Sequence, residues 1–175
     1  MGMAVSGRFR AQEVIDSGGY LDFSWKSLKI VLSDFRTPGY PAFVAAVKTI
    51  AGDSSFAIPL MQYLVYASAV VLMFFGLHKF LGDAAKALVG SATLLYSSIL
   101  HNFCSDISTD TLAAAAGLMV CGFILLAITE KRAIYHVAVG IAVIAGWQIR
   151  PAYLFLIPFV PVVTCLAAKD RKSVV

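Results

Sequence analysis

The sequence predicts an all-α membrane protein, a polytopic bundle of about five transmembrane helices with short amphipathic interfacial helices at its N-terminus. The first observation behind this prediction is composition: of 175 residues, 59% are hydrophobic and 14% are charged, whereas soluble domains carry roughly 25% charged residues. The second is the arrangement of the apolar residues in long runs separated by short, often basic connections. A chain with so little charge cannot cover its own surface with polar groups, so lipid is the expected solvent.

Residues 1–55 are expected to form an extracytoplasmic loop, and residues 56–172 the transmembrane bundle. Within the loop, an amphipathic pattern around Trp25 and Leu28 predicts one short helix, and the apolar segment 40–50 predicts a second. Both are shorter than a membrane span, and helices of this kind lie in the plane of the interface.

Five apolar stretches approach the roughly 20 residues that a spanning helix needs. They lie near residues 56–78, 87–103, 112–129, 133–149 and 152–168. The second is the weakest, because serine, histidine and asparagine interrupt it. The last contains Pro158 and Pro161, and we expect a kinked helix there because neighbouring helices in a membrane can satisfy the carbonyls that proline frees.

The basic residues predict the orientation of the bundle. Successive connections after residue 55 alternate sides, which places seven basic residues on one face, while the connections on the other face hold only Arg150. The positive-inside rule makes the seven-residue face cytoplasmic, so the net charge of +4 indicates membrane orientation rather than nucleic-acid binding. The seven are Lys79, Lys86, Lys131, Arg132, Lys169, Arg171 and Lys172.

The same alternation places the N-terminal segment outside, although that segment has no spanning helix of its own. We therefore expect a first membrane helix to precede it, and the chain to be a fragment or a truncated product. The short loops and the absence of an Asn-x-Ser/Thr sequon favour a bacterial inner membrane.

Polar residues gather at the expected extracytoplasmic mouth of the bundle. They lie in segments 16–20, 36–41 and 105–111 and at Arg150. Carboxylates and arginines at a membrane boundary are candidates for function.

These segments resemble a known group of enzymes. Asp16-Ser17-Gly18-Gly19-Tyr20, followed after 15 residues by Arg36-Thr37-Pro38-Gly39-Tyr40-Pro41, resembles the first extracytoplasmic loop of GT-C glycosyltransferases. Thr109-Asp110-Thr111-Leu112 is similar to the acidic second loop of that group, and Gly146-Trp147-Gln148-Ile149-Arg150-Pro151 to its Arg-Pro motif. The closest branch resembles glycosyltransferase family 39, with the aminoarabinose transferases and protein O-mannosyltransferases. The resemblance covers residues 14–170.

The resemblance implies an inverting transfer of a sugar from a polyprenyl-phosphate donor in the membrane to an acceptor hydroxyl on the extracytoplasmic side. It makes Asp16 the candidate general base, and Asp110 a second catalytic carboxylate that orients the site or helps to hold a divalent metal ion. The candidate substrate-binding residues are Arg36 and Arg150 for the donor phosphate, Tyr20 and Tyr40 for the sugar or acceptor pocket, and Asp106 beside Asp110.

Other interpretations of these residues remain open. Asp16 could cap a short helix near Gly18, and Asp106 or Asp110 could cap the helix that starts near residue 112. Arg36 could be a snorkelling interface residue. For the whole chain, the alternative is a small multispan protein without catalysis, either a transporter subunit or the partner of another membrane protein.

Overall fold

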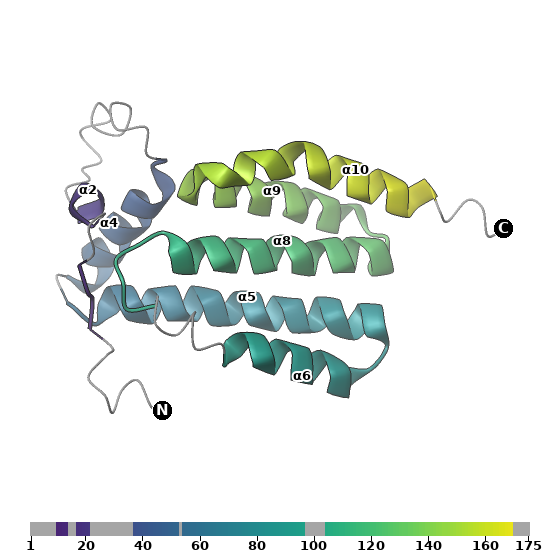
Figure 1. Cartoon of the computed structure of the whole chain (residues 1–175), viewed down its shortest axis with the longest axis horizontal. Helices are drawn as coiled ribbons and strands as arrows, with labels where there is room; N and C mark the ends of the chain where they lie inside the picture. Colours follow the sequence, from purple (N-terminus) through teal and green to yellow (C-terminus); the bar gives the residue numbers. More distant parts are fainter. Residues whose placement is uncertain (1–9, 14–16, 22–36, 53, 97–103, 170–175) are drawn as a thin grey trace.

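The computed structural model describes residues 10–13, 17–21, 37–52, 54–96 and 104–169. Every regular element in these ranges is helical (Figure 1), which confirms the predicted all-α class. The elements are α2 (Gly18–Leu21), α4 (Gly39–Ala51), α5 (Ala57–Leu81), α6 (Ala84–Leu95), α8 (Asp110–Glu130), α9 (Ala133–Ile149), the 3-10 helix η1 (Pro151–Phe155) and α10 (Leu156–Lys169).

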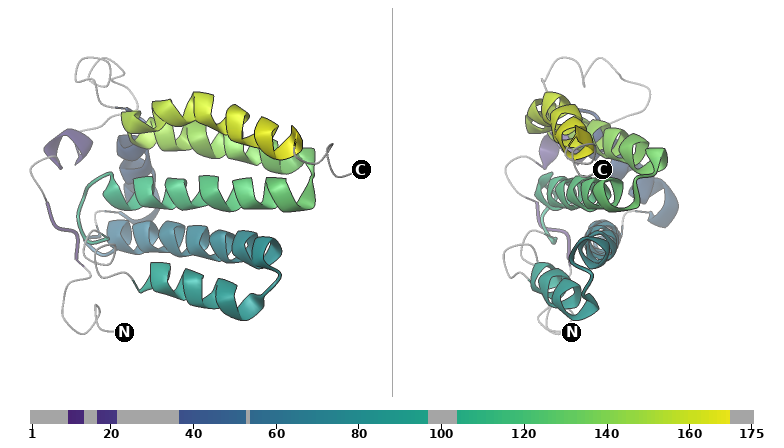
Figure 2. Two further views of the ribbon diagram at one scale, coloured as in Figure 1. Left: turned by 45° about the vertical axis from the view of Figure 1, so that its right-hand side comes forward. Right: turned by 90° about the vertical axis from the view of Figure 1, so that its right-hand side faces the viewer.

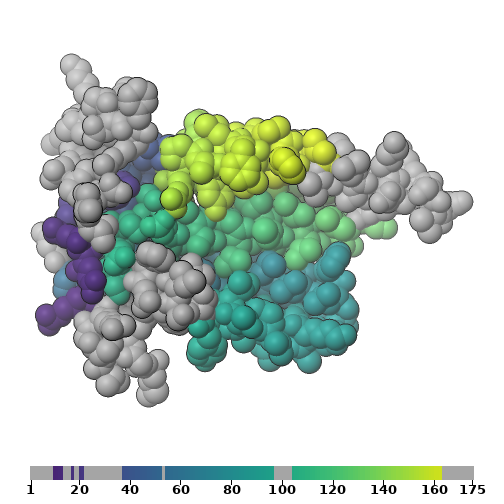
Figure 3. Space-filling model, in the orientation of Figure 1, coloured from purple at the N-terminus to yellow at the C-terminus, as the bar shows by residue number. Residues whose placement is uncertain are grey.

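The longer helices run side by side in alternating directions (Figures 1 and 2). α8 lies in the middle of the bundle, where it packs against α5 on one side and α9 on the other, while α6 packs on α5. In the space-filling view of Figure 3, α10 forms one long edge of the molecule and α6 the other. As the predicted topology requires, α5, α8 and α10 end at the same end of the bundle at which α6 and α9 begin (Figure 1).

The helices overlap the predicted apolar runs in sequence. By length and composition, two of the described helices, α5 and α8, are long and apolar enough to cross a membrane. α6, α9 and the segment Pro151–Val162 are apolar but shorter. The predicted run 87–103 extends beyond α6 into residues 97–103, which lie outside the described residues. The division at residue 55 and the number of spans therefore stay predictions.

The proline-containing run begins with η1 instead of forming one continuous α-helix. Pro158 lies in the first turn of α10, where its missing N–H would have had no helical partner, and Pro161 lies inside the helix. The outward faces of the helices are apolar, with Val71, Phe75 and Ile141 more than half exposed. Helices that are apolar on all sides suit lipid.

Two glycines bring α5 and α8 close together. A Cβ atom at Gly76 would lie 2.8 Å from the carbonyl oxygen of Gly122, and one at Gly122 would lie 3.1 Å from Cγ of Leu72. Small residues at a crossing point allow helix backbones to approach in a membrane, where packing rather than hydrophobicity drives association.

The end of the bundle at which α5 and α8 begin is covered by α4, which lies across it at a steep angle (Figure 1). α4 corresponds to the short apolar helix predicted over residues 40–50, and Tyr40, Val44 and Val47 form its buried face. The helix predicted around Trp25 lies outside the described residues.

The side chain of Gln62 connects α4 to the loop that precedes α8. Tyr40 donates its hydroxyl hydrogen to Oε1 of Gln62 at 3.0 Å. Nε2 of Gln62 donates to the carbonyl oxygens of Cys104 at 2.9 Å and Asp106 at 3.1 Å. Both Gln62 and Tyr40 are fully buried, so these hydrogen bonds satisfy groups that have lost access to water.

The N-terminal segment holds the same loop from its other side. The backbone N–H of Gln12 donates to the carbonyl oxygen of Ser105 at 2.8 Å. The carbonyl oxygen of Gln12 accepts from the backbone N–H of Ile107 at 3.0 Å. The hydroxyl of Ser17 donates to the carbonyl oxygen of Ile107 at 3.0 Å. The loop backbone is therefore fixed by side chains and backbone groups from both the N-terminal segment and α5.

We expect Gln62→Leu to lower the free energy of unfolding by about 1–3 kcal/mol, because the buried hydroxyl of Tyr40 and two loop carbonyls lose their partner. Tyr40→Phe removes only one of these bonds and should cost less. Unfolding in mixed dodecyl maltoside and sodium dodecyl sulfate, followed by circular dichroism, measures both. Ser68→Ala, at an exposed position of the same helix, serves as the control. A Gln62→Leu variant as stable as this control would contradict the role given to Gln62.

Candidate functional site

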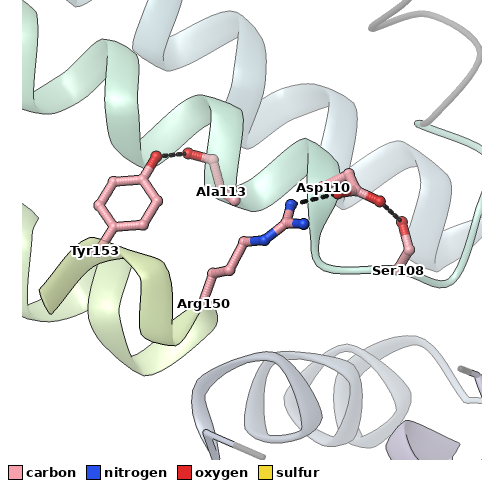
Figure 4. Close-up of polar contacts among 5 residues, drawn as sticks. All are labelled: Ser108, Asp110, Ala113, Arg150 and Tyr153. Carbon is pink, nitrogen blue, oxygen red and sulfur yellow. Dashed lines mark hydrogen bonds and ion pairs between the residues drawn. The ribbon is translucent and has the colours of Figure 1, made fainter. Parts of the chain in front are cut away.

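An ion pair joins α8 to the turn between α9 and η1. Nη1 of Arg150 lies 2.5 Å from Oδ1 of Asp110 (Figure 4). Arg150 adopts an extended conformation, with φ −142° and ψ 120°, because the following Pro151 disfavours helical geometry in the residue before it. α9 therefore ends here, and the side chain of Arg150 extends across to the start of α8 (Figure 4).

Asp110 is the first residue of α8, and Thr109 is its N-cap. The Oγ of Ser108 donates to Oδ2 of Asp110 at 3.2 Å, so both carboxylate oxygens have a partner. A negative charge in the first turn is also favoured by the helix dipole. Neither Asp106 nor Asp110 occupies the N-cap position, which leaves the carboxylate of Asp110 directed at Arg150 rather than at the backbone of α8.

Tyr153 anchors η1 beside this ion pair. Its hydroxyl donates to the carbonyl oxygen of Ala113, one turn into α8 (Figure 4). A Cβ atom at Gly146 would lie 2.6 Å from Cδ1 of Tyr153, and one at Gly117 would lie 2.8 Å from its hydroxyl oxygen. The two glycines thus create the space for the ring, and the ring fixes the turn that carries Arg150.

Asp106 lies in the loop before α8 and is partly buried. Its backbone forms an isolated parallel bridge with Gln12. Burial, together with the nearby carboxylate of Asp110, raises the pKa of Asp106. Its carboxyl group therefore keeps a proton to higher pH than an exposed aspartate does.

Tyr20 and Tyr40 pack against each other with ring centroids 4.8 Å apart and planes at 78°. Both are buried in an apolar cluster with Ile107 and Leu112. Burial, with smaller contributions from Tyr20 and the nearby aspartates, raises the pKa of Tyr40, so its hydroxyl acts as a hydrogen-bond donor. Their surroundings favour a packing role in this structure, and the predicted role in a substrate pocket stays a prediction.

Asp16 and Arg36 lie outside the described residues. Their neighbours in sequence approach the site from two directions. Ser17 is bonded to the loop between Asp106 and Asp110, and Gly39 packs so tightly on α9 that a Cβ atom there would overlap the backbone carbonyl group of Gln148. Within the described residues, the structure brings together Asp106, Asp110 and Arg150 at one end of the bundle.

An apolar groove of about 330 Å³ begins at Tyr153 and runs between α8 and α10. Of its lining residues, Ala152 and Tyr153 follow Arg150 closely in sequence, whereas Gly117, the nearest one to Asp110 on α8, lies seven residues beyond it. Its walls are Gly117, Val120, Cys121 and Ile124 of α8, with Ala152, Tyr153, Phe155, Leu156, Phe159 and Val160 on the other side. In the part of the chain that the structure describes, no three histidine, cysteine or acidic residues form a group suited to a metal ion.

Several residues of this site were not expected from the sequence. Three of them lie inside or beside apolar runs, namely Gln62, Tyr153 and Gly146. A single polar, aromatic or small residue is common in such a run and does not by itself indicate a site. Ser108 is one of many hydroxyl residues in its loop. The i, i+3, i+4, i+7 spacing of Gly117, Val120, Cys121 and Ile124 was the one available signal, because it indicates a common helix face.

Comparison with known proteins places the chain in a family. The sequence model of the family described as dolichyl-phosphate-mannose-protein mannosyltransferase matches residues 36–174. A search of curated proteins and a search of solved structures find no significant match.

We expect Gly146→Ala to lower the free energy of unfolding by about 1–3 kcal/mol, because the added methyl group overlaps the ring of Tyr153. Gly140→Ala, on the same helix with nothing within 4 Å of the new atom, should be neutral or stabilising by up to about 1 kcal/mol. The mixed-detergent unfolding assay compares the two variants. Equal stability of both would show that Tyr153 does not depend on Gly146 for its position.

Proposed function

Because the chain belongs to the dolichyl-phosphate-mannose-protein mannosyltransferase family, we propose that it moves a sugar from a polyprenyl-phosphate donor to an acceptor hydroxyl on the extracytoplasmic side of a membrane. The family and the apolar helices make the chain an integral membrane protein of the GT-C glycosyltransferase type. The observation that carries the proposal is the ion pair of Arg150 and Asp110 at the start of an apolar groove.

Arg150 suits the donor phosphate. A guanidinium group binds phosphate through two parallel hydrogen bonds, and the side chain of Arg150 is 50% exposed, so a ligand can reach it. Asp110 uses one carboxylate oxygen to hold Arg150 and the other to accept from Ser108. Because both carboxylate oxygens are engaged in this way, we assign Asp110 to the orientation of Arg150.

The groove suits the tail of the donor. A polyprenyl chain is entirely apolar, and the lining of the groove includes Ala152 and Tyr153, two and three residues after Arg150. A phosphate at Arg150 and a tail between α8 and α10 would therefore fit as one continuous molecule. The apolar tail would lie against apolar side chains of the groove. The phosphate would stay outside the hydrocarbon core, because a charge inside that core costs much more free energy.

The transfer step needs a base, and the proposal gives this role to Asp16. The acceptor oxygen forms a bond to the anomeric carbon as the bond from that carbon to the phosphate oxygen breaks, and the carboxylate of Asp16 takes the acceptor proton. The negative charge that develops on the departing polyprenyl phosphate is offset by Arg150. The hydrogen bond from Ser17, the next residue, to the loop that carries Asp106 supports this assignment.

The remaining predicted residues keep supporting roles in the proposal. Arg36 offers a second positive charge to the donor phosphate, and Tyr20 and Tyr40 support the wall of the sugar or acceptor pocket. Asp106, in the loop beside Asp110, is the remaining candidate for a contact with the substrate. The basic end of the bundle faces the cytoplasm, in a bacterial inner membrane.

We expect Arg150→Gln to weaken polyprenyl-phosphate binding by about tenfold or more, since a hydrogen bond to a charged group contributes roughly 1.5–3 kcal/mol. Native mass spectrometry of the detergent-solubilised chain, titrated with polyprenyl phosphate, measures the dissociation constant. Lys131→Gln removes a positive charge from the opposite end of the bundle, at a residue that lines neither cavity, and should leave the constant unchanged. Unaltered binding by Arg150→Gln, or equal weakening by both variants, would argue against a donor site at Arg150.

We expect Asp16→Asn to lower the rate of transfer by roughly 10²–10⁴-fold, the usual contribution of a general base, while donor binding stays as in the wild type. The assay uses membranes that contain the chain and dolichyl-phosphate mannose labelled in the sugar, and it follows label in the acceptor fraction. Insertion is checked by the same unfolding assay. Full transfer by a correctly inserted Asp16→Asn variant would remove Asp16 from the mechanism.

A further inference from the structure

A second cavity lies at the basic end of the bundle, far along α8 from Asp110. It has a volume of about 510 Å³ and is lined by residues from α5, α8 and the start of α9. Part of its lining is apolar and includes Phe75 and Phe123, whereas Lys79, Glu130 and Arg132, at the ends of their helices, contribute charged groups. The cavity thus has a hydrocarbon-like interior and a charged edge, which are the two parts of a phospholipid.

The charged edge carries a net positive charge. Nζ of Lys79 lies 2.7 Å from Oε1 of Glu130, so these two charges offset each other. Arg132 is exposed, and its guanidinium group forms no ion pair with any residue that the structure describes. Arg132 also interacts electrostatically with Glu130, so Lys79, Arg132 and Glu130 together leave one net positive charge at the edge of the cavity.

We propose that this cavity binds one anionic phospholipid of the surrounding membrane. The lipid phosphate contacts Arg132 and the ammonium group of Lys79, and an acyl chain lies along Phe75 and Phe123. Basic pockets between transmembrane helices at the cytoplasmic side recognise anionic headgroups in this way. A free phosphate ion would leave the apolar wall uncovered, whereas a lipid covers both parts of the cavity.

The position of Phe75 supports a lipid as the occupant. Its side chain is 51% exposed, and Val71, one turn earlier on α5, is 55% exposed. The apolar wall of the cavity therefore continues onto the outer, lipid-facing surface of α5. An acyl chain could enter sideways from the bilayer without crossing a polar barrier.

The test uses the full chain in detergent, titrated with phosphatidylglycerol or phosphatidylcholine and followed by native mass spectrometry. We expect tighter binding of phosphatidylglycerol, and a loss of about fivefold in Arg132→Gln, since a basic residue near a membrane contributes about 1 kcal/mol. Lys131→Gln is the matched control, because it removes the same charge from the adjacent residue, which does not line the cavity. Arg132→Lys keeps the charge and should retain most of the affinity.

Equal weakening by Arg132→Gln and Lys131→Gln would overturn the proposal, because it would indicate general attraction to a basic surface. Displacement of phosphatidylglycerol by equimolar inorganic phosphate would also overturn it, because the acyl chain would then contribute nothing. Lys131 and Arg132 both lie at the end of the bundle opposite to Arg150. The result is therefore independent of the donor site proposed at the other end of the bundle.

Discussion

The buried amide of Gln62 is the constraint on which the candidate site depends. The loop before α8 is not helical, so its backbone groups need partners at a place where the packed helices exclude water. Gln62 supplies them from inside α5, and Ser17 and Gln12 supply them from the N-terminal side. An amide is well suited to this position because it donates to the loop with one end while it accepts from Tyr40 with the other. The start of α8, and with it Asp110, is thereby fixed relative to α4 and α5.

The ion pair of Arg150 and Asp110 forms because other contacts position the two residues, and the pair itself contributes little to the stability of the fold. Its side chains are 50% and 39% exposed, and exposed pairs typically contribute no more than about 1 kcal/mol. The position of Arg150 follows instead from the extended backbone before Pro151 and from the ring of Tyr153. Since other contacts hold both residues in place, their charges can be used for a ligand without loss of the fold. A binding site for an anionic group needs charged side chains whose positions are held by other contacts.

The sequence was sufficient to predict the all-α class, because length and hydropathy alone determine which segments suit lipid. It also predicted that Asp106, Asp110 and Arg150 lie at one end of the bundle, because alternating spans fix the end to which each loop belongs. It could not predict that Arg150 reaches Asp110, since that contact depends on where α9 breaks and how η1 packs. Gln62, Gly146 and Tyr153 were missed for a related reason. Their importance arises from what lies opposite them, and periodicity within one helix contains no information about the facing helix.

The distribution of charge along α8 gives the proposed reaction a physical basis. The helix is free of formal charge between Asp110 and Glu130, and each of these residues pairs with a cation from a neighbouring helix end. The donor likewise has a charged part, the phosphate, and an apolar part, the tail. The two parts can meet the charged end and the uncharged middle of α8 only if the phosphate lies at the end of a groove that holds the tail. The groove lined by Ala152 and Tyr153 is the apolar surface that follows Arg150 in the chain. Because the backbone before Pro151 limits where Arg150 can reach, the depth of the phosphate, and hence of the anomeric carbon attached to it, would be set by the protein rather than by the lipid.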